Sequence, residues 1–176
     1  MSSPLVQQHR VFFALWPDDD CRYEVGLNIP EACRKPVPVA NLHLTLAFLG
    51  NVSDDELILL QDIGAMIKAE CFKLGLQPFG FFKKRSIFWL GTAHLPSALA
   101  SLVAQLWQQL EKQGWQREPA QFTPHVTLAR RCSNSVKATQ LIKPIFWHVR
   151  RFSLLESVSG KEGVSYQQIS SWQLSI

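Results

Sequence analysis

The stretch "NLHLTLAFLG", residues 41–50, combines an apolar strand pattern with a histidine and a threonine two positions apart. Because successive side chains of a strand point to opposite faces, His43 and Thr45 share one face with Ala47. The other face is apolar and consists of Leu42, Leu44, Leu46 and Phe48. A lone histidine in such a strand is most often a core residue with satisfied hydrogen bonds, since an unpaired buried polar group costs roughly 1 to 3 kcal/mol.

A second copy of this pattern lies 82 residues further along the chain. "HVTLAR" (125–130) repeats the histidine, threonine, leucine and alanine of "HLTLAF" (43–48) at the same spacing. A capped helix is predicted after each copy. Two such strands, paired or facing each other, would present two imidazoles and two hydroxyls to one cleft. The pair is therefore a candidate active site.

Two imidazoles in one site suit a reaction that needs an acid and a base at the same time. The unperturbed pKa of histidine, about 6.5, lets one ring accept a proton while its twin donates one. Phosphodiester cleavage and the opening of a cyclic phosphate have this requirement. Thr45 and Thr127 could bind nonbridging phosphate oxygens, although both are also ordinary β-branched strand residues.

A cation could offset the phosphate charge in such a reaction, and Arg130 and the run "KKR" (83–85) are the candidates. Strict alternation points Arg130 to the face opposite His125. Arg130 therefore reaches the cleft only if its strand ends or bulges there, and otherwise it is an exposed structural residue.

The composition is that of a globular protein, with 176 residues, 47% hydrophobic and 18% charged. This length suits one domain spanning residues 1–176, or two small lobes that share a core. The sequence has neither a basic leader nor an apolar run of 18 residues, so we expect an unprocessed, cytoplasmic protein with no membrane partner. The net charge of +4 permits an anionic partner such as nucleic acid.

The cysteines are scattered and form no C-x-x-C pair, which predicts no disulfide framework and fits a reducing cytoplasm. They are Cys21, Cys33, Cys71 and Cys132. No metal-ligand spacing, P-loop or G-x-S-x-G elbow is found, so we expect neither a metal nor another cofactor. The three remaining histidines are expected at element ends or on the surface: His9, His94 and His148.

The predicted elements mix helices with hairpins, which favours an α+β fold over an alternating parallel sheet. Helices are expected after "WPDDD" (16–20) toward Pro30, after a capping box of Ser53 and Glu56, at 95–114 and at "NSVKATQLI" (134–142). Strands are expected at 10–15, 41–50, 76–84, 86–93 and 124–130. A closing hairpin is expected from "IFWHVRRFSLLESV" (145–158) and 164–176, around "SGKEG".

The chain resembles the two-histidine (2H) phosphoesterase superfamily, most closely the bacterial RNA 2',3'-cyclic phosphodiesterases formerly called 2'-5' RNA ligases. The likeness rests on "RVFFALWP", "NLHLTLAFLG", "TPHVTLAR" and "LLESVSGKEGVSYQQISSWQL", which follow one another in the family's order. It implies two pseudo-symmetric lobes, each an antiparallel sheet with flanking helices. The two H-x-T strands would line the central cleft between the lobes.

Carried onto this sequence, the resemblance implies that His43 and His125 are the catalytic pair. Thr45, Thr127 and Arg130 would bind the substrate phosphate. Phe48 stands where the second copy has Arg130, so the two copies cannot have identical roles. We interpret Phe48 as an apolar contact for the base or ribose, with the phosphate held toward Arg130.

The implied function is metal-independent hydrolysis of RNA or nucleoside 2',3'-cyclic phosphates to 2'-phosphates, by a monomer. Because Arg130 stands beside His125, we expect His125 to act as the base on water and His43 as the acid to the departing 3'-oxygen. One alternative is a 2'-5' RNA ligase that runs the reverse step with the same acid and base. Another is an RNA-end binding module whose histidines only form hydrogen bonds to phosphate.

Overall fold

The computed structural model describes residues 8–31, 33–117, 121–133, 140–161 and 163–176. Three α-helices occur in this part of the chain: α1 (Asp19–Gly26), α2 (Asp54–Met66) and α3 (Ser97–Lys112). Two short 3-10 helices are η1 (Val39–Asn41) and η2 (Lys83–Arg85). The strands are β1 (His9–Leu15), β2 (Lys35–Pro36), β3 (Leu44–Val52), β4 (Phe72–Phe82), β5 (Ile87–Thr92), β6 (His125–Arg130), β7 (Gln140–Val149), β8 (Arg151–Gly160) and β9 (Gly163–Gln173).

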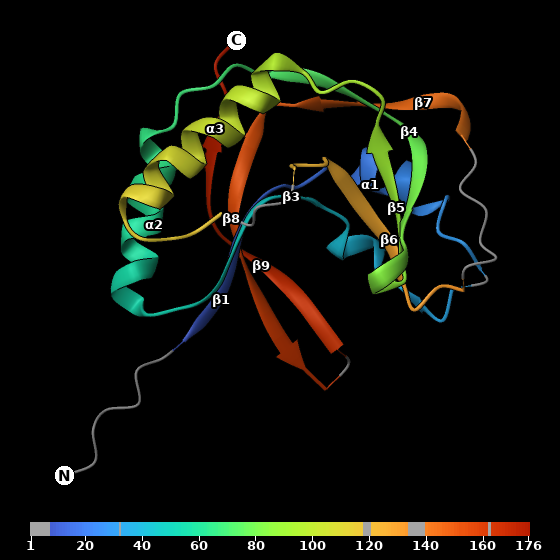
Figure 1. Cartoon of the computed structure of the whole chain (residues 1–176), viewed down its shortest axis with the longest axis horizontal. Coiled ribbons are helices and arrows are strands. Elements are labelled where there is room, and N and C mark those ends of the chain that lie inside the picture. The colour runs from blue at the N-terminus through green and yellow to red at the C-terminus, as the bar shows by residue number, and fades with distance from the viewer. Residues whose placement is uncertain (1–7, 32, 118–120, 134–139, 162) are drawn as a thin grey trace.

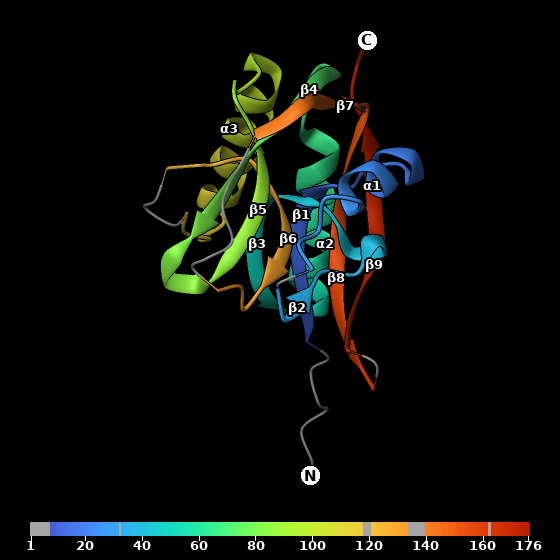
Figure 2. The ribbon, with the colours of Figure 1, turned by 90° about the vertical axis from the view of Figure 1, so that its right-hand side faces the viewer.

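All of these strands belong to one antiparallel sheet, which confirms the α+β fold (Figures 1 and 2). The strand order is β7-β4-β5-β6-β3-β1-β8-β9, and the short β2 pairs with β6. β3 and β6, which carry the two H-x-T copies, are neighbours in the middle of this order. Their ladder contains one residue pair, Leu44 with Val126. The pseudo-twofold relation between the two halves stays a prediction.

The helices cover the sheet from different sides, with α2 and α3 together on one flank and α1 on the other side of the molecule (Figure 1). The predicted apolar stripe of α3 is buried in the core and consists of Leu99, Leu102, Val103, Leu106 and Leu110. Strand β1 faces this core through Val11, Phe13 and Leu15. Within the described residues, no helix is both long and apolar enough to cross a membrane.

Local sequence signals explain where two of the helices begin. Ser53 and Glu56 form the predicted capping box of α2, in which each side chain binds the other residue's backbone N–H. Asp18 caps α1 by accepting a hydrogen bond from the backbone N–H of Cys21 at 2.9 Å. This helix ends at Gly26, earlier than the expected limit near Pro30.

Two sequence predictions near the C-terminus differ from the structure. The stretch predicted as one strand at 145–158 is divided at Arg150 into β7 and β8. The division arises because β7 pairs with β4 and β8 pairs with β1, in opposite halves of the sheet. For the helix predicted at 134–142, residues 134–139 lie outside the described residues, and 140–142 belong to β7.

A disulfide joins Cys33 to Cys132, and this bond contradicts the prediction from cysteine spacing. The two residues are 99 positions apart, so no short motif links them. They meet because β2 pairs with the end of β6, where Lys35 lies opposite Arg130. Cys21 and Cys71 are free thiols.

Candidate active site

The two H-x-T copies place their histidines at the same point of neighbouring strands. His43 directly precedes β3, and His125 is the first residue of β6. Since Leu44 is paired with Val126 in an antiparallel ladder, this register sets His43 beside Thr127 and Thr45 beside His125. The structure therefore brings the four residues of the repeated motif together.

Both histidines are held by the same type of hydrogen bond. Nδ1 of His43 donates to the carbonyl of Asn41 at 2.7 Å, and Nδ1 of His125 donates to the carbonyl of Thr123 at 2.6 Å. A carbonyl oxygen can only accept, so in each neutral ring the proton is on Nδ1 and the lone pair is on Nε2. The hydroxyl of Thr45 donates to Nε2 of His43 at 3.1 Å.

A β-bulge in β3 changes which side chains share the histidine face. Ala14 is paired with Thr45 and Phe13 with Ala47, so Leu46 is an extra residue in this strand. Beyond the bulge, Phe48 is paired with Phe12, whose ring lies 4.9 Å from that of His43. Phe48 therefore lies on the histidine face, and the prediction that strict alternation places it opposite is wrong.

An equivalent bulge in β6 reorients Arg130. Trp89 is paired with Thr127 and Phe88 with Ala129, which leaves Leu128 as the extra residue. Arg130, the last residue of β6, thereby returns to the face of Thr127 and His125. This is the bulge that the sequence required for Arg130 to reach the site. The side chain of Arg130 is exposed on that face.

The environment of the histidines favours their neutral forms. The pKa of His43 is lowered to about 4, mainly by burial and in smaller part by the positive charges of Arg130 and His125, while the hydrogen bond to Asn41 acts in the opposite direction. Burial, followed by the charge of Arg130, also lowers the pKa of His125. The "KKR" run forms η2, between β4 and β5, and none of its cations is among the charges that lower these two pKa values.

Aromatic rings surround each imidazole, and sequence reasoning missed this feature. Phe12 and Tyr166 lie with their ring centroids 4.9 Å from that of His43. Phe82 and Trp89 lie at 5.0 and 5.7 Å from the ring of His125. These residues come from β1, β9, β4 and β5. No local motif identifies them, because their position depends on how the strands pair.

The indole of Trp89 packs directly against two glycines of the sheet, Gly80 and Gly91. A Cβ atom on Gly80 would lie 1.9 Å from the indole, and one on Gly91 would lie 2.6 Å from it. The indole thus occupies space that any larger residue at these positions would take. Its Nε1 is buried and has no hydrogen-bond partner among the described residues.

Arg10 is a second cation that the sequence did not indicate. Its guanidinium lies over the ring of Phe48, 5.0 Å from the centroid. The charge of Arg10 also acts on Tyr166, whose pKa is raised overall by burial and lowered in part by Arg130 and Arg10. Each half of the site therefore has an arginine, from β1 in the first half and from β6 in the second.

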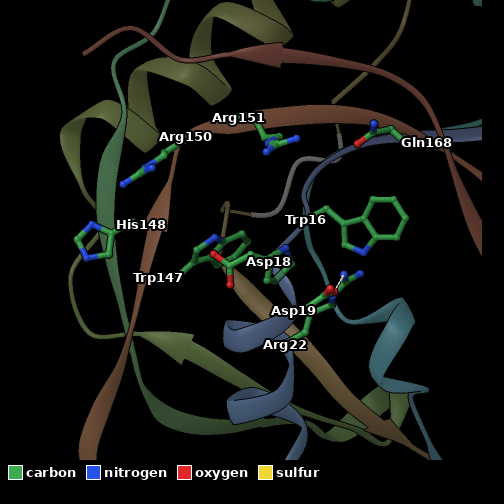
Figure 3. A pocket seen from close by; sticks show the side chains of 10 residues that line it. Trp16, Asp18, Asp19, Arg22, Trp147, His148, Arg150, Arg151 and Gln168 are labelled. Carbon is green, nitrogen blue, oxygen red and sulfur yellow. Dashed lines mark hydrogen bonds and ion pairs between the residues drawn. The ribbon is translucent and has the colours of Figure 1, made fainter.

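A pocket of about 630 Å³ lies between α1, β7, β8 and β9, and none of the predicted site residues lines it (Figure 3). The indole of Trp16 lies at this pocket and donates to the carbonyl of Ala40 at 3.2 Å. Arg22 stacks on Trp16 at 5.3 Å and forms an ion pair with Asp19. Within the described residues, no three His, Cys, Asp or Glu side chains gather as metal ligands.

Comparison with known proteins agrees with this geometry. The 2'-5' RNA ligase superfamily matches residues 17–161. A protein of Escherichia coli K12 named RNA 2',3'-cyclic phosphodiesterase is 30% identical over 99% of both chains. One of the same name from Thermus thermophilus is 29% identical, over 94% of this chain and 90% of that protein.

Solved structures show the same fold over nearly the whole chain. E. coli LigT complexed with 3'-AMP superposes with a TM-score of 0.87 and 31% identity, covering 96% of this chain and 99% of LigT. A crystal structure described as a phosphoesterase reaches a TM-score of 0.89 with 29% identity, over 97% of this chain and all (100%) of that chain. The chain therefore belongs to the 2'-5' RNA ligase superfamily of two-histidine phosphoesterases.

Proposed function

We propose that this protein opens RNA or nucleoside 2',3'-cyclic phosphates by hydrolysis, leaving a 2'-phosphate, with His43 and His125 as the proton-transfer groups. The observation that carries the proposal is the pair of neutral imidazoles with the same tautomer, on one face of adjacent strands. The relatives named RNA 2',3'-cyclic phosphodiesterase support this choice of substrate.

The reaction needs one histidine in each protonation state. Nε2 of neutral His125 accepts a proton from water while the water oxygen attacks phosphorus. The bond from phosphorus to the 3'-oxygen breaks, and protonated His43 donates its Nε2 proton to that oxygen. The product is a 2'-phosphate with a free 3'-hydroxyl. Proton exchange with solvent then restores both rings.

Thr45 has a hydroxyl whose role changes with the charge of His43. In the neutral state, this hydroxyl donates to Nε2 of His43. Once His43 is protonated, Nε2 becomes a donor and the Thr45 oxygen can accept from it. The hydroxyl proton is then available for a phosphate oxygen. We assign the same phosphate contact to Thr127, which lies on the same face in the second copy.

Arg130 and Phe48 occupy equivalent positions after the two bulges and give the site its direction. We assign Arg130 to the nonbridging phosphate oxygens, because a guanidinium can bind two of them at once. Phe48 is 51% exposed on the histidine face and is assigned to the ribose or base. The phosphate then lies toward β6 and the nucleoside toward β3, which places His125 at the attacking water.

The alternative functions are less well supported. A 2'-5' RNA ligase would use the same two histidines in reverse, but the abundance of water favours hydrolysis. The curated relative from E. coli is named RNA 2',3'-cyclic phosphodiesterase. The two solved structures are described as LigT and as a phosphoesterase. An RNA-end binding module would not turn over a cyclic phosphate, so turnover excludes it.

Product analysis on a nucleoside 2',3'-cyclic phosphate in the presence of EDTA tests the proposal. We expect unchanged turnover and a nucleoside 2'-phosphate, because the two imidazoles supply the proton transfers directly. Loss of turnover with EDTA and its recovery with a divalent ion would contradict the metal-independent mechanism. A 3'-phosphate product would show that the bond from phosphorus to the 2'-oxygen breaks, and not the bond to the 3'-oxygen that we propose.

A substrate with an activated 3'-leaving group distinguishes the two histidines. Such a group departs without protonation, so the acid becomes dispensable. We expect His43→Ala to regain much of its rate on this substrate and His125→Ala to regain little. Recovery by His125→Ala alone would reverse the assigned roles.

We also propose that the protein is a cytoplasmic monomer with a single domain over residues 1–176. The continuous sheet across both halves supports one folding unit. Disulfides are rare in cytosolic proteins, so a cytoplasmic location means that the Cys33–Cys132 bond must resist cellular thiols. Sedimentation and cell fractionation test these two points.

A further inference from the structure

The segment that presents His43 is joined to the closing hairpin by the side chain of Asn41. Asn41 is the last residue of η1 and is only 8% exposed. Its backbone carbonyl accepts the hydrogen bond from Nδ1 of His43, and its side-chain Nδ2 donates to the backbone carbonyl of Val164 at 2.7 Å. Val164 is the second residue of β9 and lies 123 positions further along the chain. One residue therefore contacts both the imidazole and a remote strand.

The strand that Asn41 reaches also packs against His43. Tyr166, two residues after Val164 in β9, lies edge-on to the imidazole with the ring centroids 4.9 Å apart. Tyr166 also contacts Phe12, which lies beside the same imidazole. The hydrogen bond from Asn41 thus holds β9 close to the segment that carries His43, where this ring contact forms.

The two ends of β9 are supported by different parts of the molecule. β9 is the last strand in the sheet order and pairs with β8. Toward its C-terminal end, Ser170 donates to Gln61 of α2 at 2.8 Å, and Trp172 packs on Gly64 of the same helix. The turn end of the hairpin projects away from α2 and α3 (Figure 1). The bond from Asn41 supports β9 near this turn, away from the contacts with α2.

The backbone of η1 has supports of its own. The carbonyl of Ala40 accepts hydrogen bonds from the indole of Trp16 at 3.2 Å and from the guanidinium of Arg22 in α1 at 3.4 Å. Truncating the side chain of Asn41 therefore leaves the backbone carbonyl that orients His43. What such a truncation releases is β9.

The second copy of the motif lacks this connection. Its equivalent of Asn41 is Thr123, whose carbonyl holds His125. The hydroxyl of Thr123 donates to the carbonyl of Gln121, two residues away, at 3.4 Å. The side chain at this position bonds locally in the second copy and to a remote strand in the first, so the two histidines are supported differently.

We propose that Asn41 is a positioning residue for the reaction, which keeps β9, and with it Tyr166, packed against His43. The proposal rests on the proposed function, in which His43 is the acid, and adds that the closing hairpin supports this acid. Asn41 acts through His43 and makes no contact with the substrate. Without the Asn41 amide, the ring of Tyr166 can leave the imidazole, so that water enters and the orientation of the acid is less well fixed.

An NMR titration of the His43 ring provides the first test and needs no turnover. The titratable and charged groups around His43 are Tyr166 from β9 and His125 and Arg130 from β6. Asn41→Ala removes none of these groups, and it lessens the burial that is the main cause of the low pKa. We therefore expect the pKa of His43 to rise in this variant from about 4 toward 6.5. An unchanged pKa would overturn the proposal.

Further variants show that the effect passes through β9. Tyr166→Ala should raise the pKa of His43 in the same direction, and Asn41→Ala/Tyr166→Ala should raise it no further than the larger single change. Asn41→Ser, whose hydroxyl is too short to reach Val164, replaces Asn41→Ala if that variant does not fold. Asn28→Ala is the matched control, because it removes a side-chain bond to a carbonyl elsewhere and should leave the pKa of His43 unaltered. Additive rises in the double variant would overturn the proposal.

Kinetics separate positioning of the acid from a general structural role. We expect Asn41→Ala to lower kcat on a nucleoside 2',3'-cyclic phosphate by about tenfold or more, because the acid is less well oriented. The loss should be much smaller on the substrate with an activated 3'-leaving group, which needs no acid. In a His43→Ala background, Asn41→Ala should cause no further loss. Equal losses on both substrates, or a further loss in the double variant, would overturn the proposal.

The two readouts distinguish failure of this proposal from failure of the proposed function. If the wild type turns over no cyclic phosphate while Asn41→Ala still raises the pKa of His43, the proposed function fails and the support of His43 by β9 is upheld. If the wild type turns over the substrate and the pKa of His43 does not change in Asn41→Ala, the positioning role of Asn41 alone is wrong.

Discussion

The lowered pKa values of His43 and His125 set the pH range in which the proposed reaction can run. One ring must be protonated and the other neutral, and this mixed state is most populated between the two macroscopic pKa values of the pair. Burial and Arg130 move both pKa values below 6.5, that of His43 to about 4. We therefore expect a bell-shaped profile of kcat/KM with its maximum below pH 6.5. A maximum above pH 8 would contradict the two-histidine mechanism.

The profile of kcat should differ in a defined direction. A bound phosphate anion favours the imidazolium form, so the pKa values in the complex are higher than those in the free protein. We expect the maximum of kcat at a higher pH than that of kcat/KM. Steady-state rates over pH 4 to 9, at constant ionic strength, measure both profiles.

Loss of either site histidine should remove most of the turnover. We expect His43→Ala and His125→Ala each to lower kcat by about two to four orders of magnitude, the usual effect of losing a general acid or base. Circular dichroism and thermal unfolding should show a retained fold. His94→Ala, which changes a histidine outside the site, is the matched control and should leave kcat unaltered. Near-normal turnover in either site variant would contradict the mechanism.

Arg130 tests the charge requirement separately from proton transfer. We expect Arg130→Ala to lower kcat/KM on a mononucleotide by about 10²- to 10³-fold, because a fixed positive charge near the phosphate is lost. Arg130→Lys should recover only part of this, since an ammonium cannot make the forked contact of a guanidinium. Kinetics of a folded Arg130→Ala protein that match the wild type would assign Arg130 to the exposed surface.

At the scale of strands and helices, the sequence predicted the elements that depend on local patterns. The capping box of Ser53 and Glu56 and the apolar stripe of α3 are examples, because their interactions lie within a few residues. The bulges at Leu46 and Leu128 were not predictable, since a period of two assumes an uninterrupted ladder. They decide on which face Phe48 and Arg130 lie, so sequence alone identified these residues without placing them.

His9 connects three elements, although it was expected at an element end or on the surface. It begins β1 as expected, but its imidazole is buried and forms hydrogen bonds of 2.7 Å to Glu156 in β8 and 2.8 Å to Asp54 in α2. These carboxylates raise the pKa of His9, with the hydrogen bond to Asp54 as the largest cause. Protonation of His9 therefore strengthens the connection.

The stability contribution of His9 should depend on pH in a predictable direction. Because the pKa of the folded state lies above the unfolded value of 6.5, the contribution is complete below pH 6.5 and is lost as pH rises through the folded pKa. We expect His9→Ala to lower the free energy of unfolding by roughly 1 to 2 kcal/mol near pH 6, for two lost hydrogen bonds. The difference should shrink by pH 9. Urea unfolding of the wild type and His9→Ala at pH 6 and pH 9 measures this difference in the free energy of unfolding. A difference that grows with pH would contradict the prediction.

At the scale of the whole molecule, the Cys33–Cys132 bond connects residues 99 positions apart. In the chain-entropy account, a closed loop of about 100 residues stabilises the folded state by up to about 4.7 kcal/mol. We expect Cys132→Ser, or treatment with dithiothreitol, to lower Tm, because either change opens this loop. Cys71→Ser changes a free thiol and should leave Tm unaltered. An unchanged Tm after complete reduction would show that the bond does not stabilise the fold.

The long-range arrangement explains what the sequence could not provide. The repeat of H-x-T indicated that two strands belong together, and the structure pairs them through Leu44 and Val126. The aromatic residues around His43 and His125, the Arg10–Phe48 contact and the disulfide all depend on pairings between remote strands. Each becomes visible only when the order of strands in the sheet is known.

The paired bulges have a consequence for the evolution of this site. They give positions 48 and 130 the same place after a bulge, and the two halves carry different side chains there. The polarity with which an RNA strand crosses the sheet is thus set by the choice of Phe or Arg at two positions and not by the architecture. A descendant that exchanged them could bind the strand in the reverse direction and interchange the duties of its histidines.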